Sequence, residues 1–322
     1  MNFLCSTADI QSPFPEIEKH KTKNGWFLYL DKGWTKTDNY YYKGFSSSWC
    51  KIFVDPIVRI ETNKLRDFPI YYNEDSTSNF SKLDNILPVD GILEIDDKIH
   101  ISYKENFYPR ITHKHQTFKE CHDLLYDALI ENIGTFASTN NDTVYIPLQG
   151  GIDTLTVRSV FDFLNVKYEL FEMPKENPIS SQLHSELAKK NWGFTQVKET
   201  QGVIVTGFYG DEWVLRNPVY VHMALSLRGV NLTKEFDKIE NCYMKWFFES
   251  SSYRGKCNKP STETLDEIIR KLCNDFQIWH LNNTKIFSPL KHLSLLTLLS
   301  ADTQTMLDQV TDAKLSKSII KY

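Results

Sequence analysis

One segment, residues 143–173, constrains the fold of this chain more than any other. Thr143–Leu148 is an apolar run with almost no polar alternation, which is typical of a strand covered on both faces. Gly150-Gly151 then turns the chain, a helix is expected over Asp153–Asn165, and Tyr168–Met173 forms a second apolar strand. Strand, helix and strand at this spacing make a βαβ unit, so the sequence predicts a parallel sheet.

Helical periodicity surrounds this unit and extends through the second half of the chain. Apolar residues three and four apart predict an amphipathic helix before it, with one face formed by Phe118, Cys121, Leu124, Leu125, Ala128, Leu129 and Ile133. Further expected elements are a helix at Ser180–Lys190, a strand at Gly202–Thr206, and helices near Thr264–Leu281 and Leu290–Ser300. We therefore expect an α/β domain over residues 113–322.

The first part of the chain has a different character. Short β-rich pieces alternate with turn residues, at Trp26–Leu30, Lys51–Val54, Ile70–Tyr72, Ile92–Ile95 and Ile99–Tyr103. Alternating apolar positions and many aromatic residues are typical of an antiparallel sheet with one buried face. The sequence predicts a β-rich domain over residues 1–112.

Charge and composition narrow the partners and the compartment. The net charge of −4 provides no basic footprint, so nucleic acid is not an expected partner. No apolar run approaches the roughly 20 residues of a membrane span, and no secretory signal is visible, so a cytoplasmic protein is expected. The six cysteines have neither metal-site nor redox-motif spacing and are expected to be reduced and buried: Cys5, Cys50, Cys121, Cys242, Cys257 and Cys273.

The segment Pro147–Thr154 carries the first candidate site. Glycines allow backbone amides to approach a phosphate, and a helix start adds free N–H groups and the positive end of the helix dipole. Thr154 offers a hydroxyl, and Asp153 can hold a magnesium ion that binds phosphate. The alternative is a plain turn in which Asp153 caps the helix. The spacing by itself does not decide between the two.

A second candidate segment, Val203–Trp213, repeats the pattern of an apolar strand followed by glycines, and it ends in Asp211-Glu212. Parallel strands present their carboxyl ends to one crevice, where ligands bind, so Asp153 and Asp211 are expected to meet there. Two carboxylates at one phosphate site suit a magnesium–pyrophosphate complex. A solvated acidic loop is the alternative for this segment taken alone.

The two segments resemble known sequence motifs. Gln149-Gly-Gly-Ile-Asp-Thr154 looks like the Ser-Gly-Gly-x-Asp-Ser loop of ATP pyrophosphatases, and Gly207-Phe-Tyr-Gly-Asp-Glu212 resembles the second motif of asparagine synthetases and β-lactam synthetases. Phe287-Ser-Pro-Leu-Lys-His-Leu293 is similar to the segment before that family's final helices. Arg66–Tyr72 and Leu87–Glu94 resemble segments of its class II glutamine amidotransferase domain. The resemblance covers most of the chain.

The resemblance implies an N-terminal hydrolase fold of the glutaminase type, and a C-terminal fold of the adenine-nucleotide α-hydrolase type. It also implies an ATP- and Mg²⁺-dependent carbon–nitrogen ligase that forms an acyl-adenylate from a carboxylate and passes it to an amine. The residues implied to bind nucleotide are Gln149, Gly150, Gly151, Asp153, Thr154, Gly207 and Gly210. Asp153 and Asp211 are the implied metal ligands. Lys314 and Lys317 are the candidates for the family's catalytic lysine, with a solvated basic helix end as the alternative.

Three departures from the family pattern shape the expectation. Asn2 stands where the family has its nucleophilic cysteine, so the N-terminal domain is expected to be a scaffold without glutaminase activity. Gln149 replaces the first serine of the loop, and the segment between Gly150 and Gly210 is short, so aspartate is not supported as the substrate. Small carboxylates and amines are the expected partners, and an oligomer is compatible with the sequence. Two alternatives stay open: an inactive nucleotide- or partner-binding descendant, and a loop enzyme that modifies a nucleotide or nucleic acid base.

Overall fold

The computed structural model describes two compact units of the chain, residues 3–103 and residues 115–320, with gaps in each. The described residues are 3–11, 16–32, 34–45, 48–63, 70–79, 83–88, 91–103, 115–148, 151–171, 202–238, 248–249, 253–275 and 285–320. The boundary expected at residue 112 and the helix expected at Ser180–Lys190 lie outside these residues. Each unit is described by itself below.

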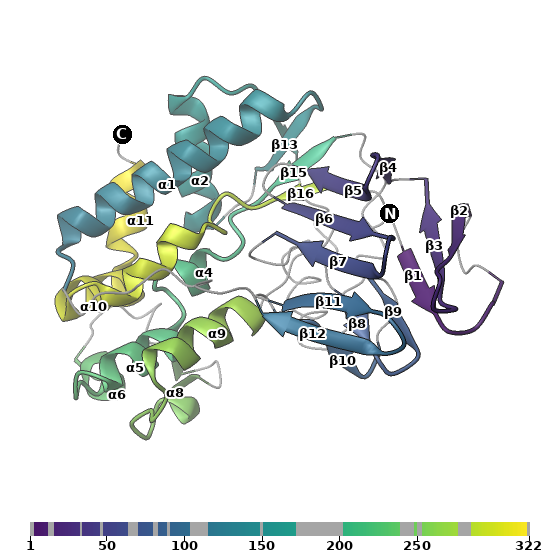
Figure 1. Ribbon diagram of the computed structural model, residues 1–322. Helices are drawn as coiled ribbons and strands as arrows, with labels where there is room; N and C mark the ends of the chain where they lie inside the picture. Colours follow the sequence, from purple (N-terminus) through teal and green to yellow (C-terminus); the bar gives the residue numbers. More distant parts are fainter. Residues whose placement is uncertain are drawn as a thin grey trace. The chain divides into compact units, whose positions relative to one another are not determined.

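The first unit contains two antiparallel six-stranded sheets (Figure 1). One has the order β10-β8-β9-β1-β3-β2, with strands β1 (Phe3–Ser6), β2 (Glu16–Lys21), β3 (Phe27–Asp31), β8 (Tyr71–Tyr72), β9 (Ser76–Ser78) and β10 (Asn85–Ile86). The other has the order β12-β11-β7-β6-β5-β4, with strands β4 (Thr35–Lys36), β5 (Tyr40–Phe45), β6 (Ser48–Phe53), β7 (Val58–Thr62), β11 (Gly91–Ile95) and β12 (Ile99–Tyr103). The expected antiparallel β-rich region is confirmed.

Alternation of side chains explains why these strands pair as they do. In β7 and β11 every second residue is buried, so each strand has one face toward the core and one toward solvent. Phe3, Leu28 and Leu30 from the first sheet belong to the same buried cluster as Ile52 and Ile60 from the second. The two sheets therefore share one hydrophobic core.

The second unit is built on a parallel sheet of four strands in the order β14-β13-β15-β16. The strands are β13 (Val144–Pro147), β14 (Glu169–Phe171), β15 (Val203–Val205) and β16 (Lys285–Phe287). The βαβ prediction is confirmed, with α2 (Ile152–Phe163) between β13 and β14. Because β13 lies between β14 on one side and β15 on the other, the strand order changes direction between β13 and β15. Such a switch point opens a crevice at the carboxyl ends of the strands.

Helices make up the rest of this unit. They are α1 (Phe118–Thr139), α4 (Gly210–Trp213), α5 (Pro218–Ser226), α6 (Leu232–Phe236), α8 (Tyr253–Lys256), α9 (Leu265–Asp275), α10 (Thr303–Asp312) and α11 (Lys314–Ile320). The segment expected as a helix near residues 290–300 is helical over Leu293–Ser300, in the tighter 3₁₀ form. No helix in the described part of the chain combines the length and the apolar character that crossing a membrane requires.

Helix α1 anchors the second unit. Thr117 and Glu120 form a capping box at its start, and the expected apolar face is buried. The Phe136 ring stacks on the Phe287 ring of β16 at a centroid distance of 4.2 Å, and it lies 6.2 Å from the Phe161 ring of α2. Helix α11 packs on α2 and α1 (Figure 1). The helix that begins at the candidate phosphate loop is therefore held rigidly against the sheet.

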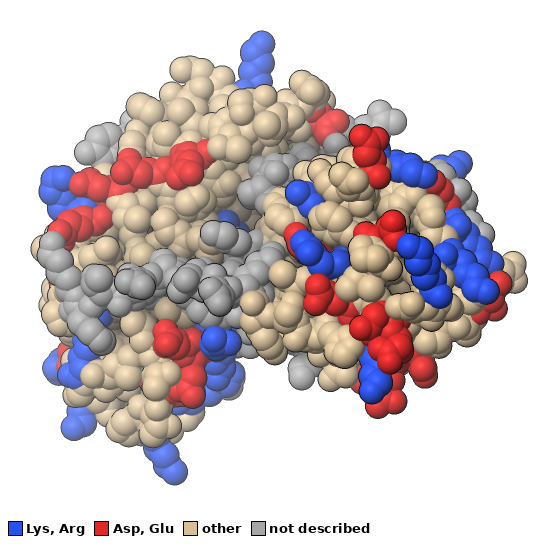
Figure 2. All heavy atoms as spheres, viewed as in Figure 1, with Lys and Arg blue, Asp and Glu red and all other residues tan. Residues whose placement is uncertain are grey.

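The described thiols are buried, as the sequence predicts. The five described cysteines are buried, at Cys5, Cys50, Cys121, Cys257 and Cys273, and none forms a disulfide with another of the five, whereas Cys242 lies outside the described residues. Acidic and basic side chains are interspersed on the face drawn in Figure 2.

Candidate functional site

The first candidate segment lies at the carboxyl end of β13. Gly151 is the N-cap of α2 in an extended conformation (φ −68°, ψ −177°), and Asp153 lies in the first turn of the helix. A Cβ added at Gly151 would meet no atom within 4 Å among the described residues. Because Gly151 has no side chain, it does not cap the first backbone N–H groups of α2. Gln149 and Gly150, the first two predicted phosphate contacts, lie outside the described residues.

The second candidate segment follows β15 and packs directly on this helix start. A Cβ at Gly207 would lie 2.3 Å from the Thr154 backbone nitrogen, and one at Gly210 would lie 2.2 Å from the Asp153 Cγ atom. Both positions therefore require glycine. The spacing Gly-x-x-Gly allows the turn after β15 to touch the first turn of α2, and this contact brings the two predicted segments together.

Local backbone geometry directs the side chains that follow. Tyr209 (φ 72°) and Leu215 (φ 57°) flank α4 in the left-handed region, which is uncommon for residues with a side chain. The turn at Leu215 brings the Arg216 N–H to the Asp211 carbonyl oxygen at 2.9 Å. Non-glycine residues in this conformation concentrate at functional sites, where the surrounding structure maintains them.

Asp153 and Asp211 meet at one guanidinium group. The Arg216 Nη1 atom lies 2.5 Å from Asp153 Oδ2 and 3.3 Å from Asp211 Oδ1. The Asp153 side chain is 15% exposed and the Asp211 side chain is 45% exposed, so Asp153 is largely enclosed and Asp211 faces solvent. The structure thus brings both predicted metal ligands to one guanidinium group, in the segments that follow β13 and β15.

Two carboxyl groups of this site have raised pKa values. Burial raises the pKa of Asp153 to about 7; Arg216 opposes this shift and the charge of Asp211 adds to it. Burial, followed by the charge of Asp211, raises the pKa of Glu212 to about 8, while a hydrogen bond from Asn217 acts in the opposite direction. Burial is the largest cause of both raised pKa values, and a bound cation would oppose them by favouring the charged carboxylates.

A magnesium–phosphate complex fits the residues present. The Asp153 Oδ1 atom is buried and has no hydrogen-bond partner among the described residues, whereas Oδ2 is engaged by Arg216. Magnesium is usually held by one or two carboxylates together with phosphate oxygens and water. Asp153 and Asp211 are the residues that would hold it.

Two functional candidates were missed by the sequence-based reasoning. Arg216 was missed because it lies beyond the second motif, and the sequence pattern does not show where its side chain points. Lys291 belongs to the recognised segment 287–293, but its burial, with 8% exposure, was not foreseen. Its Nζ atom lies 5.1 Å from the centre of the Tyr209 ring, directly beside the turn that carries Gly210 and Asp211. Lys291 therefore adds a buried positive charge beside this turn.

Lys314 and Lys317, the predicted catalytic lysines, lie on α11. Lys314 pairs with Asp308 at 2.9 Å and Lys317 with Asp312 at 2.5 Å, and each lysine side chain is 49% exposed. Their ammonium groups are thus engaged by acids of α10 at the surface. Their catalytic role stays a prediction.

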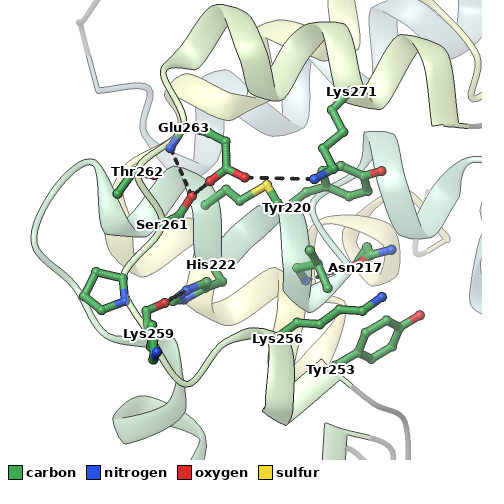
Figure 3. A pocket seen from close by; sticks show the side chains of 13 residues that line it. Asn217, Tyr220, His222, Tyr253, Lys256, Lys259, Ser261, Thr262, Glu263 and Lys271 are labelled. Carbon is green, nitrogen blue, oxygen red and sulfur yellow. Dashed lines mark hydrogen bonds and ion pairs between the residues drawn. The ribbon is translucent and has the colours of Figure 1, made fainter.

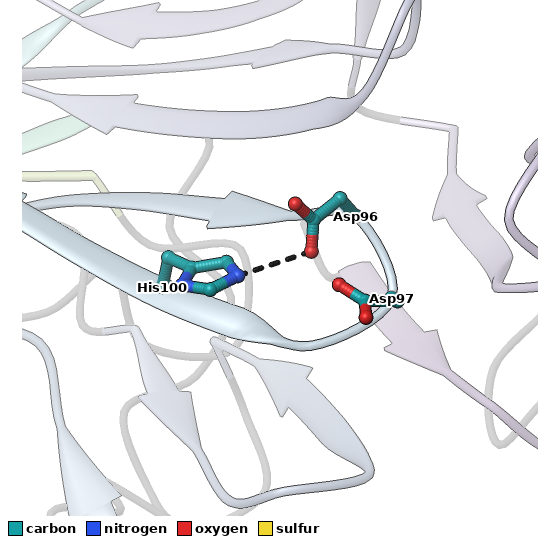
Figure 4. A group of neighbouring side chains, drawn as sticks. All are labelled: Asp96, Asp97 and His100. Carbon is teal, nitrogen blue, oxygen red and sulfur yellow. Dashed lines mark hydrogen bonds and ion pairs between the residues drawn. The ribbon is translucent and has the colours of Figure 1, made fainter.

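One further group of possible metal ligands is present in the described residues, in the turn between β11 and β12 (Figure 4). Asp96 Oδ1 accepts hydrogen bonds from the Lys98 N–H at 3.0 Å and from the His100 ring at 3.1 Å. Asp97 is exposed. These bonds account for Asp96 as the residue that closes a β-hairpin, so the group gives no independent reason to assign a metal.

Comparison with known proteins adds no relative. No protein-family model matches the chain, and no curated protein matches its sequence. The functional interpretation therefore depends on the geometry of the site and on the short motifs.

Proposed function

We propose that this protein is an ATP-dependent, adenylate-forming carbon–nitrogen ligase of the asparagine synthetase type. The observation that carries the proposal is the meeting of Asp153 and Asp211, from the ends of two neighbouring parallel strands, at Arg216. Asp153 and Asp211 are 58 residues apart in the sequence. Their segments share only one pattern, in which a strand is followed by a glycine turn and then by an acidic residue. The named folds of the two domains are part of the same proposal.

The proposed reaction has two steps. A carboxylate oxygen of the acid attacks the α-phosphorus of ATP, and the bond to the β-phosphate oxygen breaks, so that pyrophosphate leaves with the electron pair. An amine then attacks the carbonyl carbon of the acyl-adenylate, loses a proton and displaces AMP.

The residues of the chain have separate roles in this scheme. The N–H groups at the start of α2, next to Gly151, bind phosphate oxygens. Asp153 and Asp211 hold the metal, which when bound neutralises charge on the phosphate oxygens. Arg216 and Lys291 provide positive charge near the leaving pyrophosphate. Preorganised charges of this kind supply most of the rate in phosphoryl and nucleotidyl transfer.

A second candidate is favoured by the Arg216 contacts. A guanidinium group that already bridges both carboxylates competes with a metal for Asp153. This arrangement is expected of a descendant that binds nucleotide or a partner protein without forming an adenylate. The first candidate requires Arg216 to release Asp153 or to share it when ATP binds.

Exchange of labelled pyrophosphate into ATP separates these candidates. The ligase predicts Mg²⁺-dependent exchange with at least one acid of a panel, and at least a hundredfold loss in Asp153→Ala and Asp211→Ala, with Asp123→Asn as the control. Asp123 is an exposed acid of α1 that pairs with Lys119. Thermal stabilisation by MgATP without exchange would favour the binding protein. Absence of both signals from the wild-type chain would refute the ATP site.

A further inference from the structure

One atom of Arg216 contacts both acids of the carboxylate site. The Nη1 atom lies 2.5 Å from Asp153 Oδ2 and 3.3 Å from Asp211 Oδ1. Contacts of this length between a guanidinium group and carboxylates are charge-assisted hydrogen bonds and ion pairs. The arginine therefore balances the charge of the same two carboxylates that would hold the metal ion.

The guanidinium group and a metal ion compete for this place. A magnesium ion held directly by Asp153 lies about 2.0–2.1 Å from a carboxylate oxygen. Because Nη1 already lies 2.5 Å from Oδ2, the two cations would be only a few ångströms apart. Like charges repel strongly at that separation in a site as enclosed as that of Asp153, whose side chain is 15% exposed. A free divalent cation therefore has to displace the guanidinium group or bind against its charge.

The main chain on both sides of Arg216 is fixed. The Arg216 N–H donates to the Asp211 carbonyl oxygen at 2.9 Å, and the Val214 carbonyl oxygen accepts from Gln309 Nε2 at 2.9 Å. Asn217 is the N-cap of α5. Displacement of the guanidinium group thus moves the side chain alone, on a backbone that stays beside the acids.

The Arg216 side chain belongs to the carboxylate site and not to the neighbouring hollow of the second unit. That hollow lies between α5, α8 and α9, and Asn217 lines it (Figure 3). Arg216 is not among the described residues that line it. Its side chain is 18% exposed and contacts Asp153 and Asp211 instead.

A triphosphate offers the displaced guanidinium group a new partner. Phosphate oxygens accept paired hydrogen bonds from arginine, whose planar donors match their geometry. Asp153 lies in the first turn of α2, so phosphate bound at the start of this helix comes close to the group that Asp153 engages. A free cation brings no such acceptor. It would leave a largely enclosed guanidinium group without its two carboxylates, which is strongly unfavourable.

We propose that Arg216 makes the site selective for a divalent cation bound to a triphosphate over the free cation, by pairing with both carboxylates until phosphate oxygens replace them. Arg216 is then a specificity-determining residue of the reaction. Its transfer to phosphate rests on the proposed function, whereas its exclusion of free cations does not.

Binding of Mn²⁺, a paramagnetic substitute for Mg²⁺, tests the exclusion without any nucleotide. Electron paramagnetic resonance measures the free ion during a titration. Arg216→Gln should bind Mn²⁺ about tenfold more tightly than the wild type, a usual size for the coupling between two competing groups. The additional change Asp153→Asn should remove this gain. Arg216→Met, which keeps the apolar stem without the charge, repeats the test, and thermal unfolding verifies that each variant is folded.

The chain provides a matched control for the loss of an arginine between two acids. Arg254 pairs with Asp237 and with Glu249 at 2.8 Å each, and both acids are exposed. Arg254→Gln should therefore leave Mn²⁺ binding unchanged, because exposed carboxylates are well hydrated and hold a cation weakly.

Mn²⁺ bound to α,β-methylene-ATP, which cannot release pyrophosphate, tests the transfer to phosphate. Arg216→Gln should bind this complex about tenfold more weakly than the wild type in titration calorimetry, opposite in sign to its effect on free Mn²⁺. Arg216→Lys keeps the charge but not the planar donors. It should exclude free Mn²⁺ and still bind the complex more weakly than the wild type.

The outcomes separate this proposal from the proposed function. Free Mn²⁺ binding that is unchanged or weaker in the folded Arg216→Gln and Arg216→Met variants overturns the exclusion. Tighter binding of both free Mn²⁺ and the complex overturns the transfer to phosphate. If the two effects have opposite signs and no acid supports pyrophosphate exchange, the role of Arg216 stands and the ligase reaction fails.

Discussion

Gly210→Ala should destabilise the protein and abolish ligand binding at the carboxylate site, because the new methyl group would clash with Asp153. The added Cβ would lie 2.2 Å from Asp153 Cγ and 2.5 Å from Asp153 Oδ1, whereas ordinary van der Waals contacts begin at 3.4 Å. Asp153 therefore has to move by about 1 Å, which disturbs its contact with Arg216. Overpacking of this kind costs about 1–3 kcal/mol. In a unit of this size, that corresponds to a fall in Tm of roughly 2–12 °C.

The chain offers a matched control for this substitution. Gly134 lies within α1, and a Cβ there would meet nothing within 4 Å among the described residues. Gly134→Ala should therefore gain up to about 1 kcal/mol from helix propensity alone. Thermal unfolding of both variants is measured beside the wild type.

The functional consequence is larger than the loss of stability. A misplacement of about 1 Å at a positioning group can cost about a hundredfold in rate. We expect Gly210→Ala to lose MgATP stabilisation and pyrophosphate exchange at temperatures where it is still folded. A Gly210→Ala protein as stable as Gly134→Ala, with wild-type MgATP binding, would refute the packing of the two segments.

Three further predictions concern the second unit. The free energy of unfolding of Gly151→Ala should lie within about 1 kcal/mol of the wild-type value, because the added Cβ meets no described atom within 4 Å. The variant should nevertheless lose MgATP binding, measured by calorimetry, if the phosphates occupy that space. The folded-state pKa values of Asp153 and Glu212, about 7 and 8, lie above the ordinary values of 3.8 and 4.5, so folding favours their protonated forms. That stability is complete below the ordinary values and is lost as pH rises from there through the folded values of about 7–8. Tm without magnesium should therefore fall between about pH 4 and 8 and level off above, and a flat profile over that range would contradict the burial. Phe136→Ala removes the ring stacked on Phe287 and should cost about 3–5 kcal/mol in urea unfolding, whereas Phe163→Ala, at a side chain 54% exposed, should cost far less.

Short-range patterns were sufficient to predict the type of most elements. Apolar residues at three- and four-residue steps located α1, and unbroken apolar runs located β13, β14 and β15, because burial on one face or on two leaves a direct mark on the sequence. Ends were less well determined. The strand expected from Tyr168 begins at Glu169, while Glu172 and Met173 lie outside the described residues, and the last predicted helix is a 3₁₀ helix that begins at Leu293.

The sequence by itself determined that two glycine turns, each followed by an acid, would close the ends of two buried strands. Gly207 and Gly210 are visible in the second of these turns, but the sequence does not show what they pack against. Only the tertiary structure decided that these glycines pack against the first turn of α2, that Arg216 bridges the two acids, and that Lys291 is buried beside them. The physical reason is that hydrophobic periodicity is recorded residue by residue along the chain. Charge pairing depends instead on which strands become neighbours and on where each backbone turn directs its side chain.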